Sequence, residues 1–207
     1  MIQFSNDSVY NFEHALRGAR NPMNSWAKSD SFYDDKGFYV LGKNDLDLAQ
    51  RLCRAGSDHR KFMRQILVSV DINAPMYWWK EYDTYKVGTT ANSTSTMHKI
   101  HSKRIELNDF SHDQLIPNSL DALKNYIQYL ESIRLSYNES KSKEDWYQLI
   151  QLLPSSYNQL RTCTLSYENL FHMYHSRKTH KLQEWLDFCK WVETLPYTKE
   201  LIIELEK

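Results

Sequence analysis

The chain has 207 residues, of which 41% are apolar and 25% are charged, and Lys plus Arg balances Asp plus Glu at 26 each. This composition excludes a disordered chain and a membrane-embedded one, and the balanced charge gives no strong sign of nucleic-acid binding. Gly and Pro number only five each, so we expect regular structure through most of the chain.

The cysteines and the N-terminal residues bear on the cellular compartment. Cys53, Cys163 and Cys189 are far apart and form no CxxC pair, which predicts free thiols in a reducing compartment. The N-terminal residues show no basic region followed by an apolar run, and no apolar stretch approaches the roughly 20 residues of a membrane helix. We therefore expect a cytoplasmic protein without a signal peptide.

The first part of the chain predicts two helices and one strand. Residues 11–20 predict a short helix, residues 21–37 are polar and predict a loop, and residues 38–41 predict a short strand. Asp45 is expected to be the N-cap residue of the next helix, which Gly56 ends.

The middle of the chain changes from an apolar strand to a polar segment. Residues 66–73 are β-branched at alternate positions and predict a strand with one buried face. Pro75 suits the first position of an aromatic helix that follows. Residues 88–104 are dominated by Thr, Ser, Asn and His, which predicts a long loop that is functional or disordered.

The second half predicts three amphipathic helices. The first begins at Pro117 and keeps an apolar stripe from Leu120 to Tyr137, and the second contains Trp146 and ends before Pro154. The third runs from about Lys181 to Pro196. Because we find no repeat and no clear linker, the sequence predicts a single α+β domain over residues 1–207, with a mixed or antiparallel sheet and several long helices.

Three groups of residues could support a metal site or nucleophilic chemistry. His98 with His101, and His172 with His175, are spaced three residues apart and could share a helix face that binds a metal. No third ligand stands at a recognisable spacing, so exposed or hydrogen-bonded histidines are favoured over a metal. Cys163 could be a nucleophile, but nothing indicates a neighbouring base, and a small buried residue is the better interpretation.

Two cationic segments could bind phosphate. The hydroxyl-rich segment Lys86–His98 is flanked by lysines, which suits a phosphate-bearing small molecule as well as it suits a solvated loop. Residues 170–177 predict a helix that ends in a cationic cluster of Arg177, Lys178, His180 and Lys181. Helix capping explains this cluster, and a phosphate clamp is the functional alternative.

These segments are where the chain resembles the flavin-dependent thymidylate synthases. Ala15–Arg20 is similar to an early Ala-Val-Arg-Ala-Ala-Arg segment of that family, and Ala74-Pro75 matches the step into the helix that carries its signature. The later part of the chain also follows the family's order: Leu153-Pro154 is followed by a strand, by a helix that ends at Arg177, and then by His180 and Glu184. The resemblance covers about half of the chain and implies that family's fold.

The departures from the family pattern fall on residues that bind its ligands. The family signature is Arg-His-Arg followed by two residues and Ser. The matching segment of this chain is residues 80–89, which lacks the first Arg and the His, and only Lys86 could replace the last Arg. The family's Asn and Arg contacts in the last matching helix fall at Ser166 and Glu168. A Lys or an acid does not replace a bidentate Arg.

The resemblance implies a divergent protein of pyrimidine metabolism that binds a dUMP-like nucleotide. It implies FAD as the cofactor, a homotetramer as the assembly and, if the protein is an active enzyme, flavin- and folate-dependent one-carbon transfer. The implied phosphate-binding residues are Arg177, Lys86, Ser93 and Ser95, and the implied pocket-lining residues are Gln65, Lys80, Glu81 and His180. The alternatives are a repurposed nucleotide- or protein-binding module and a metal-dependent hydrolase.

Overall fold

The computed structural model describes residues 1–205, and the chain divides into two units. The first unit contains Met1–Ser5, Asp71–Thr84 and Ala91–Thr162, and the second contains Asn6–Val70, Tyr85–Thr90 and Cys163–Lys207. No helix within residues 1–205 is long and apolar enough to cross a membrane. The single domain expected from the sequence stays a prediction.

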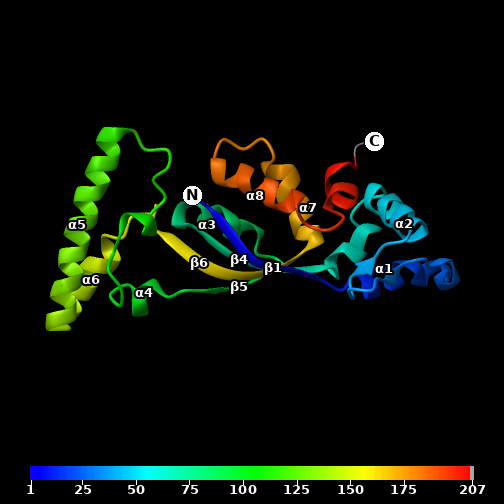
Figure 1. Cartoon of the computed structure of the whole chain (residues 1–207), viewed down its shortest axis with the longest axis horizontal. Coiled ribbons are helices and arrows are strands. Elements are labelled where there is room, and N and C mark those ends of the chain that lie inside the picture. Colours follow the sequence, from blue (N-terminus) through cyan, green and yellow to red (C-terminus); the bar gives the residue numbers. More distant parts are fainter. Residues whose placement is uncertain (206–207) are drawn as a thin grey trace. The chain divides into compact units, whose positions relative to one another are not determined.

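The main sheet has the strand order β1-β4-β6-β5 (Figure 1). These strands are Gln3–Tyr10, Leu67–Pro75, Asn158–Ser166 and Thr90–Ser93 in that order. Strands β4 and β6 run antiparallel, because Ser69 hydrogen-bonds Thr164 while Asp71, farther along β4, accepts from Thr162, which comes earlier in β6. Together with the helices, this sheet confirms the expected α+β class.

The first unit is built on a helical hairpin. Helix α5 (Pro117–Ser140) packs against α6 (Lys143–Gln151), with Leu130 and Leu149 among the buried residues that they share with neighbouring segments. Ser142 caps α6 by accepting a hydrogen bond from the amide of Asp145 at 3.1 Å. The unit also contains α3 (Met76–Tyr82) and the short helix α4 (Thr96–Lys99).

The second unit contains the other helices and a small hairpin. Helices α1, α2, α7 and α8 cover Phe12–Arg20, Lys43–Arg54, Tyr167–Arg177 and Gln183–Glu193. Strands β2 (Phe32–Tyr33) and β3 (Tyr39–Val40) pair antiparallel, a 3₁₀ turn spans Arg60–Arg64, and a π-helical turn spans Lys199–Ile203. Helix α7 packs against α8, the Arg60–Arg64 turn and the π-helical turn.

Strand β4 and the helix after it agree with the sequence prediction to within two residues. The alternating residues from Ile66 to Ile72 are all buried, with exposures of 0–1%, which confirms the predicted buried face. Pro75 is the N-cap residue of α3 rather than its first helical residue. Its φ of −69° and ψ of 150° are extended, so the strand continues up to the helix.

The expected N-cap role of Asp45 is wrong. The N-cap residue of α2 is Gly42, and Asp45 lies in the first turn of the helix, where it is fully buried and pairs with Arg20 at 2.6 Å. Its second carboxylate oxygen accepts from the hydroxyl groups of Ser29 and Ser31. Asp45 therefore ties α1 and the segment before β2 to α2. Gly56, with φ of 104°, follows the C-cap residue as expected.

The polar segment of residues 88–104 is more regular than a loop. It contains β5 and α4, and the amide of Thr94 donates to the carbonyl of Leu160 at 2.9 Å. An edge strand needs backbone partners but no apolar side chains, so hydrophobic periodicity does not reveal it. The prediction of a long loop is corrected here.

Candidate functional site

Arg177 ends helix α7 in a cluster of aromatic rings in the second unit. Its guanidinium carbon lies 4.9 Å from the ring centre of Trp185 and 5.4 Å from that of Tyr85. The carbonyl of Arg177 accepts from the amide of His180, whose ring centre lies 6.4 Å from that of Trp185. Cation–π contacts therefore orient the guanidinium. The structure thus places Arg177 and His180 beside the same Trp185 ring.

A pocket of about 600 Å³ lies along α7 beside this cluster, and we call it the α7 pocket. It is lined by Arg64, Tyr85, Val87, Ser166, Glu168, Asn169, His172 and Ser176. All these residues belong to the second unit, and Lys86 stands between two of them in sequence. The volume is within the range of about 300–1,000 Å³ that is usual for small-molecule sites.

Glu168, which lines the α7 pocket, belongs to a largely buried ion pair. The guanidinium of Arg60 lies 3.0 Å from the carboxylate of Glu168, and their side chains are 11% and 9% exposed. Arg60 also stacks on the ring of Phe171, with 3.9 Å between the guanidinium carbon and the ring centre. His172 contacts the same carboxylate at 3.1 Å from the solvent side. The acid therefore presents no unopposed negative charge to the pocket.

The start of α7 holds the loop that carries Lys86. Ser166 and Asn169 form a capping box, and the amide of Asn169's side chain donates to the carbonyl of Val87 at 2.8 Å. The amide and the hydroxyl of Thr89 both donate to the carbonyl of Lys86 at 3.0 Å. This turn needs the φ of +75° at Gly88, which favours glycine. Lys86 is thereby exposed beside the pocket.

Three polar groups of the α7 pocket are available to a ligand. Within residues 1–205, no hydrogen bond or ion pair occupies the guanidinium of Arg64, the hydroxyl of Ser176 or the hydroxyl of Tyr85. Ser166 and Asn169 are already engaged with each other. With Glu168 opposed by Arg60, the available charge in the pocket is cationic, so the arrangement suits an anionic ligand that also offers a flat ring to Tyr85.

Two solved structures from Helicobacter pylori are similar to this chain. One is thymidylate synthase X with FAD and dUMP, at 16% identity over 99% of this chain and 98% of that one, with a TM-score of 0.70. The other, a flavin-dependent thymidylate synthase complexed with FAD and dUMP, has 18% identity, 97% coverage of each chain and a TM-score of 0.68. The chain has the fold of the flavin-dependent thymidylate synthases. No family model and no curated protein matches the sequence.

This fold holds the remaining residues implied by the resemblance at other places. Gln65 is exposed and lines a different pocket of about 700 Å³, where its side-chain oxygen faces Gly18. Ser93 is exposed at the end of β5, and Ser95 is the N-cap of α4, where its hydroxyl accepts from the amide of His98 at 3.1 Å.

The other two implied residues lie on α3 in the first unit. Lys80 is exposed, and Glu81 is half-buried with its carbonyl accepting from the hydroxyl of Thr84 at 2.7 Å. Ser93 and Ser95 also belong to the first unit, whereas Arg177, Lys86, Gln65 and His180 belong to the second. The roles of all eight residues in binding stay predictions.

His172 and His175, which were considered as a metal pair, have separate structural partners. His175 lies 2.8 Å from the carbonyl of Ile202, whereas His172 faces Glu168, so the two imidazoles have different partners. No group of three His, Cys, Asp or Glu side chains that could hold a metal occurs within residues 1–205. Cys163 is fully buried, as the apolar interpretation predicted, and burial raises the pKa of the Cys53 thiol to about 12.

The sequence prediction missed Arg64 and His172 as residues of the α7 pocket, and Arg60 as the partner of Glu168. Arg60 and Arg64 stand four residues apart just before Gln65, and His172 stands four residues after Glu168. Glu168 stands where the family has an Arg, and a buried acid needs a cation from another segment. This substitution was the one sign in the sequence that a cation such as Arg60 lies nearby. Nothing in the local pattern shows that Arg60 supplies it.

Proposed function

We propose that the α7 pocket binds a pyrimidine nucleotide of the dUMP type, and that FAD binds to the same fold. The observation that carries this proposal is the cationic pocket beside Arg177, with Tyr85 at its wall, in a chain that is similar to two proteins solved with FAD and dUMP. The protein is then a divergent thymidylate synthase-like nucleotide-binding protein.

The residues of the pocket fit a nucleotide phosphate by charge. Arg64 offers a guanidinium fork, and Lys86 and Ser176 can add an ammonium group and a hydroxyl group. Arg177 is oriented by Tyr85 and Trp185 and would approach the phosphate from the end of α7. Tyr85 offers a ring on which a base or an isoalloxazine can stack. We infer that these groups replace part of the missing Arg-His-Arg signature.

Catalysis would require more than binding. When bound, a reduced flavin supplies hydride, and a folate carries the one-carbon unit. The chain's own contribution would be to position the nucleotide through Arg64 and Arg177. The loss of the family signature favours a second candidate, a nucleotide-binding module without turnover. Formation of dTMP from dUMP with reduced flavin and methylenetetrahydrofolate distinguishes the two.

Thermal unfolding with and without dUMP or FAD tests binding directly. At a ligand concentration about a hundredfold above Kd, the expected rise in Tm is about 5–10 °C for a chain of this size. The visible spectrum of the purified protein, read before and after adding FAD, reports flavin separately. A colourless protein whose Tm responds to neither ligand would refute the proposal.

Two variants locate the binding site. Arg64→Ala is expected to weaken dUMP binding at least about tenfold, because it removes the open guanidinium of the α7 pocket. Arg54→Ala is the matched control, since Arg54 is an exposed arginine of the same unit outside the pocket. Arg177→Ala should abolish nucleotide binding while circular dichroism shows retained structure. Unchanged affinity in both pocket variants would place the nucleotide elsewhere.

The resemblance also leads us to propose a homotetramer, and the three dispersed cysteines lead us to propose the cytoplasm as its location. In the family, the site lies between subunits, so the missing ligand contacts would come from neighbouring copies. Light scattering of the purified protein tests the assembly, with a tetramer as the expected mass. A monomer at all concentrations would contradict this part of the proposal, while the binding measurements stand by themselves.

A further inference from the structure

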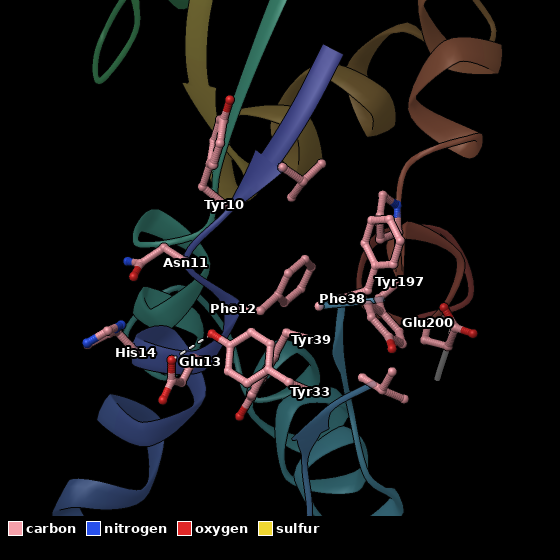
Figure 2. Close-up of a pocket in the computed structure, with 14 residues that line it drawn as sticks. Tyr10, Asn11, Phe12, Glu13, His14, Tyr33, Phe38, Tyr39, Tyr197 and Glu200 are labelled. Atoms are coloured by element: carbon pink, nitrogen blue, oxygen red, sulfur yellow. Dashed lines mark hydrogen bonds between the residues drawn. The ribbon is translucent and has the colours of Figure 1, made fainter. Parts of the chain in front are cut away.

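A second pocket in the second unit has a different lining from the α7 pocket. It has a volume of about 780 Å³ and lies between the start of α1, the β2–β3 hairpin and the segment from Pro196 to Glu200 (Figure 2). We call it the aromatic pocket, because Tyr10, Phe12, Tyr33, Phe38, Tyr39 and Tyr197 all line it. None of the groups assigned to nucleotide binding contributes to it.

The aromatic side chains pack against one another, yet three of them, Tyr10, Tyr33 and Phe38, remain exposed to solvent. Tyr33 and Tyr39 pack edge-to-face with 5.0 Å between ring centres, and Phe12 and Tyr197 do so at 5.4 Å. Even so, Tyr33 is 57% exposed and Phe38 is 67% exposed. Large rings that gather at an open pocket mark an interaction site more often than scattered apolar residues do.

The backbone at Tyr197 adds a second sign of function. Its φ of 58° is in the left-handed region, which is unfavourable for a bulky residue. Its hydroxyl accepts a hydrogen bond from the amide of Leu41 at 2.9 Å, at the end of the β2–β3 hairpin. The ring of Tyr197 is therefore held beside the pocket by an unfavourable backbone conformation, and residues in such conformations are common at ligand-binding sites.

The charged residues of the aromatic pocket are acidic. Among its lining residues are Glu13 and Glu200, and the lining contains no Lys or Arg. Figure 2 shows the two acids on opposite sides of the drawn rings. Glu13 accepts a hydrogen bond from the hydroxyl of Tyr33 at 2.8 Å. Glu200 is half-buried, and its carboxylate has no hydrogen bond or ion pair with any residue in the described part of the chain.

We propose that the aromatic pocket binds a small alkylated ammonium ion. The faces of aromatic rings attract a cation, and the Glu200 carboxylate supplies the opposite charge. A guanidinium carries five N–H donors that need acceptors when they are desolvated, and aromatic rings supply none. A quaternary ammonium nitrogen has no N–H bond and so needs no acceptor, while its methyl groups gain apolar contact with the rings. Aromatic cages recognise quaternary ammonium groups in this way.

Isothermal titration with choline chloride tests the proposal on the full chain. The matched probe is dimethylbutanol, the uncharged carbon analogue of choline, which has the same shape without the charge. We expect choline to bind with one-to-one stoichiometry and the neutral alcohol to bind at least about tenfold more weakly. Equal binding of both probes, or no saturable binding of choline, would overturn the proposal.

Two substitutions at solvent-accessible positions locate the choline site. Glu200→Gln is expected to weaken choline binding at least about tenfold, and Phe38→Ala is expected to weaken it severalfold. Glu204→Gln is the matched control, because Glu204 follows one turn later in the chain and does not line the pocket. Thermal unfolding of each variant verifies that it is folded. Normal choline affinity in folded Glu200→Gln would show that the carboxylate does not hold the cation.

Discussion

The α7 pocket and the aromatic pocket lie in the same unit but differ in charge. The α7 pocket presents the open guanidinium of Arg64, and its one acid is opposed by Arg60. The aromatic pocket presents the open carboxylate of Glu200 and no Lys or Arg. Their volumes, about 600 and 780 Å³, are similar. Charge rather than size therefore separates the ligands that the two pockets can accept.

Each pocket depends on a buried ion pair between distant segments. Arg60 with Glu168 fixes a wall of the α7 pocket, and Arg20 with Asp45 fixes the segment before the hairpin that lines the aromatic pocket. Removing one partner leaves an uncompensated buried charge, which costs far more than losing an exposed pair. Breaking these pairs one at a time asks whether the two pockets are structurally independent.

The largest effect is expected for the pair beside the α7 pocket. Arg60→Met keeps the contact with Phe171 but leaves Glu168 buried without its guanidinium, so the free energy of unfolding should fall by about 3–5 kcal/mol. Urea denaturation measures this change. Arg51→Met is the control, because Arg51 and Asp47 form a pair in which each side chain is 64% exposed, and it should cost less than about 1 kcal/mol. Equal losses in the two variants would contradict a structural role for Arg60.

Asp45→Asn should destabilise the protein somewhat less, by about 3 kcal/mol, because Asn retains some hydrogen bonding to the serines. The effect should depend on pH. Burial raises the pKa of the Asp45 carboxyl, but hydrogen bonds from Ser31, Ser29 and Arg20 outweigh it and hold the pKa below its usual value. The contribution of Asp45 is therefore present above about pH 4 and is lost as pH falls through the lower folded-state pKa.

Urea midpoints measured in steps from neutral to acid pH test this assignment. The wild-type protein should lose more stability than Asp45→Asn across the acid range, so that the difference between them narrows as pH falls. A difference that stays constant with pH would show that the carboxylate charge of Asp45 does not contribute.

The sequence reveals elements with apolar periodicity better than it reveals the pockets. Strand β4 and helix α7 were predicted because alternating or helical apolar positions are visible within a few residues. Arg60 and Glu168, which form an ion pair, are 108 residues apart in the sequence, and no local pattern connects them. Asp45 illustrates the same limit, since an acid near a helix start suggests capping until the buried Arg20 is known.

The candidate sites were also only partly predictable from the sequence. The family resemblance directed attention to Arg177, Lys86 and His180, which the structure places around the Tyr85–Trp185 cluster or beside it. It gave no reason to expect the aromatic pocket, whose rings come from the start of α1, the hairpin and the chain near Tyr197. Aromatic residues suit a core as well as a binding site, and only their exposure distinguishes the two.

Binding measurements on variants of both pockets test whether their specificities are separate. Arg64→Ala should weaken dUMP binding about tenfold and leave choline binding unchanged, whereas Glu200→Gln should do the reverse. Titration calorimetry of the two variants with both ligands gives all four values. If either substitution weakens the binding of both ligands equally, either the two pockets are coupled or the variant is partly unfolded. Thermal unfolding of that variant distinguishes these two explanations.

The smallest expected effect concerns the two acids of the aromatic pocket. The hydrogen bond to Glu13 raises the pKa of the Tyr33 hydroxyl, so Glu13→Gln should lower that pKa toward its usual value of about 10. A pH titration of labelled tyrosine followed by NMR measures it, with Glu200→Gln as the control that leaves Tyr33 unchanged. Because the Glu13 carboxylate already accepts a hydrogen bond from Tyr33, Glu13→Gln should weaken choline binding less than Glu200→Gln does. The reverse order would identify Glu13 as the carboxylate that meets the cation.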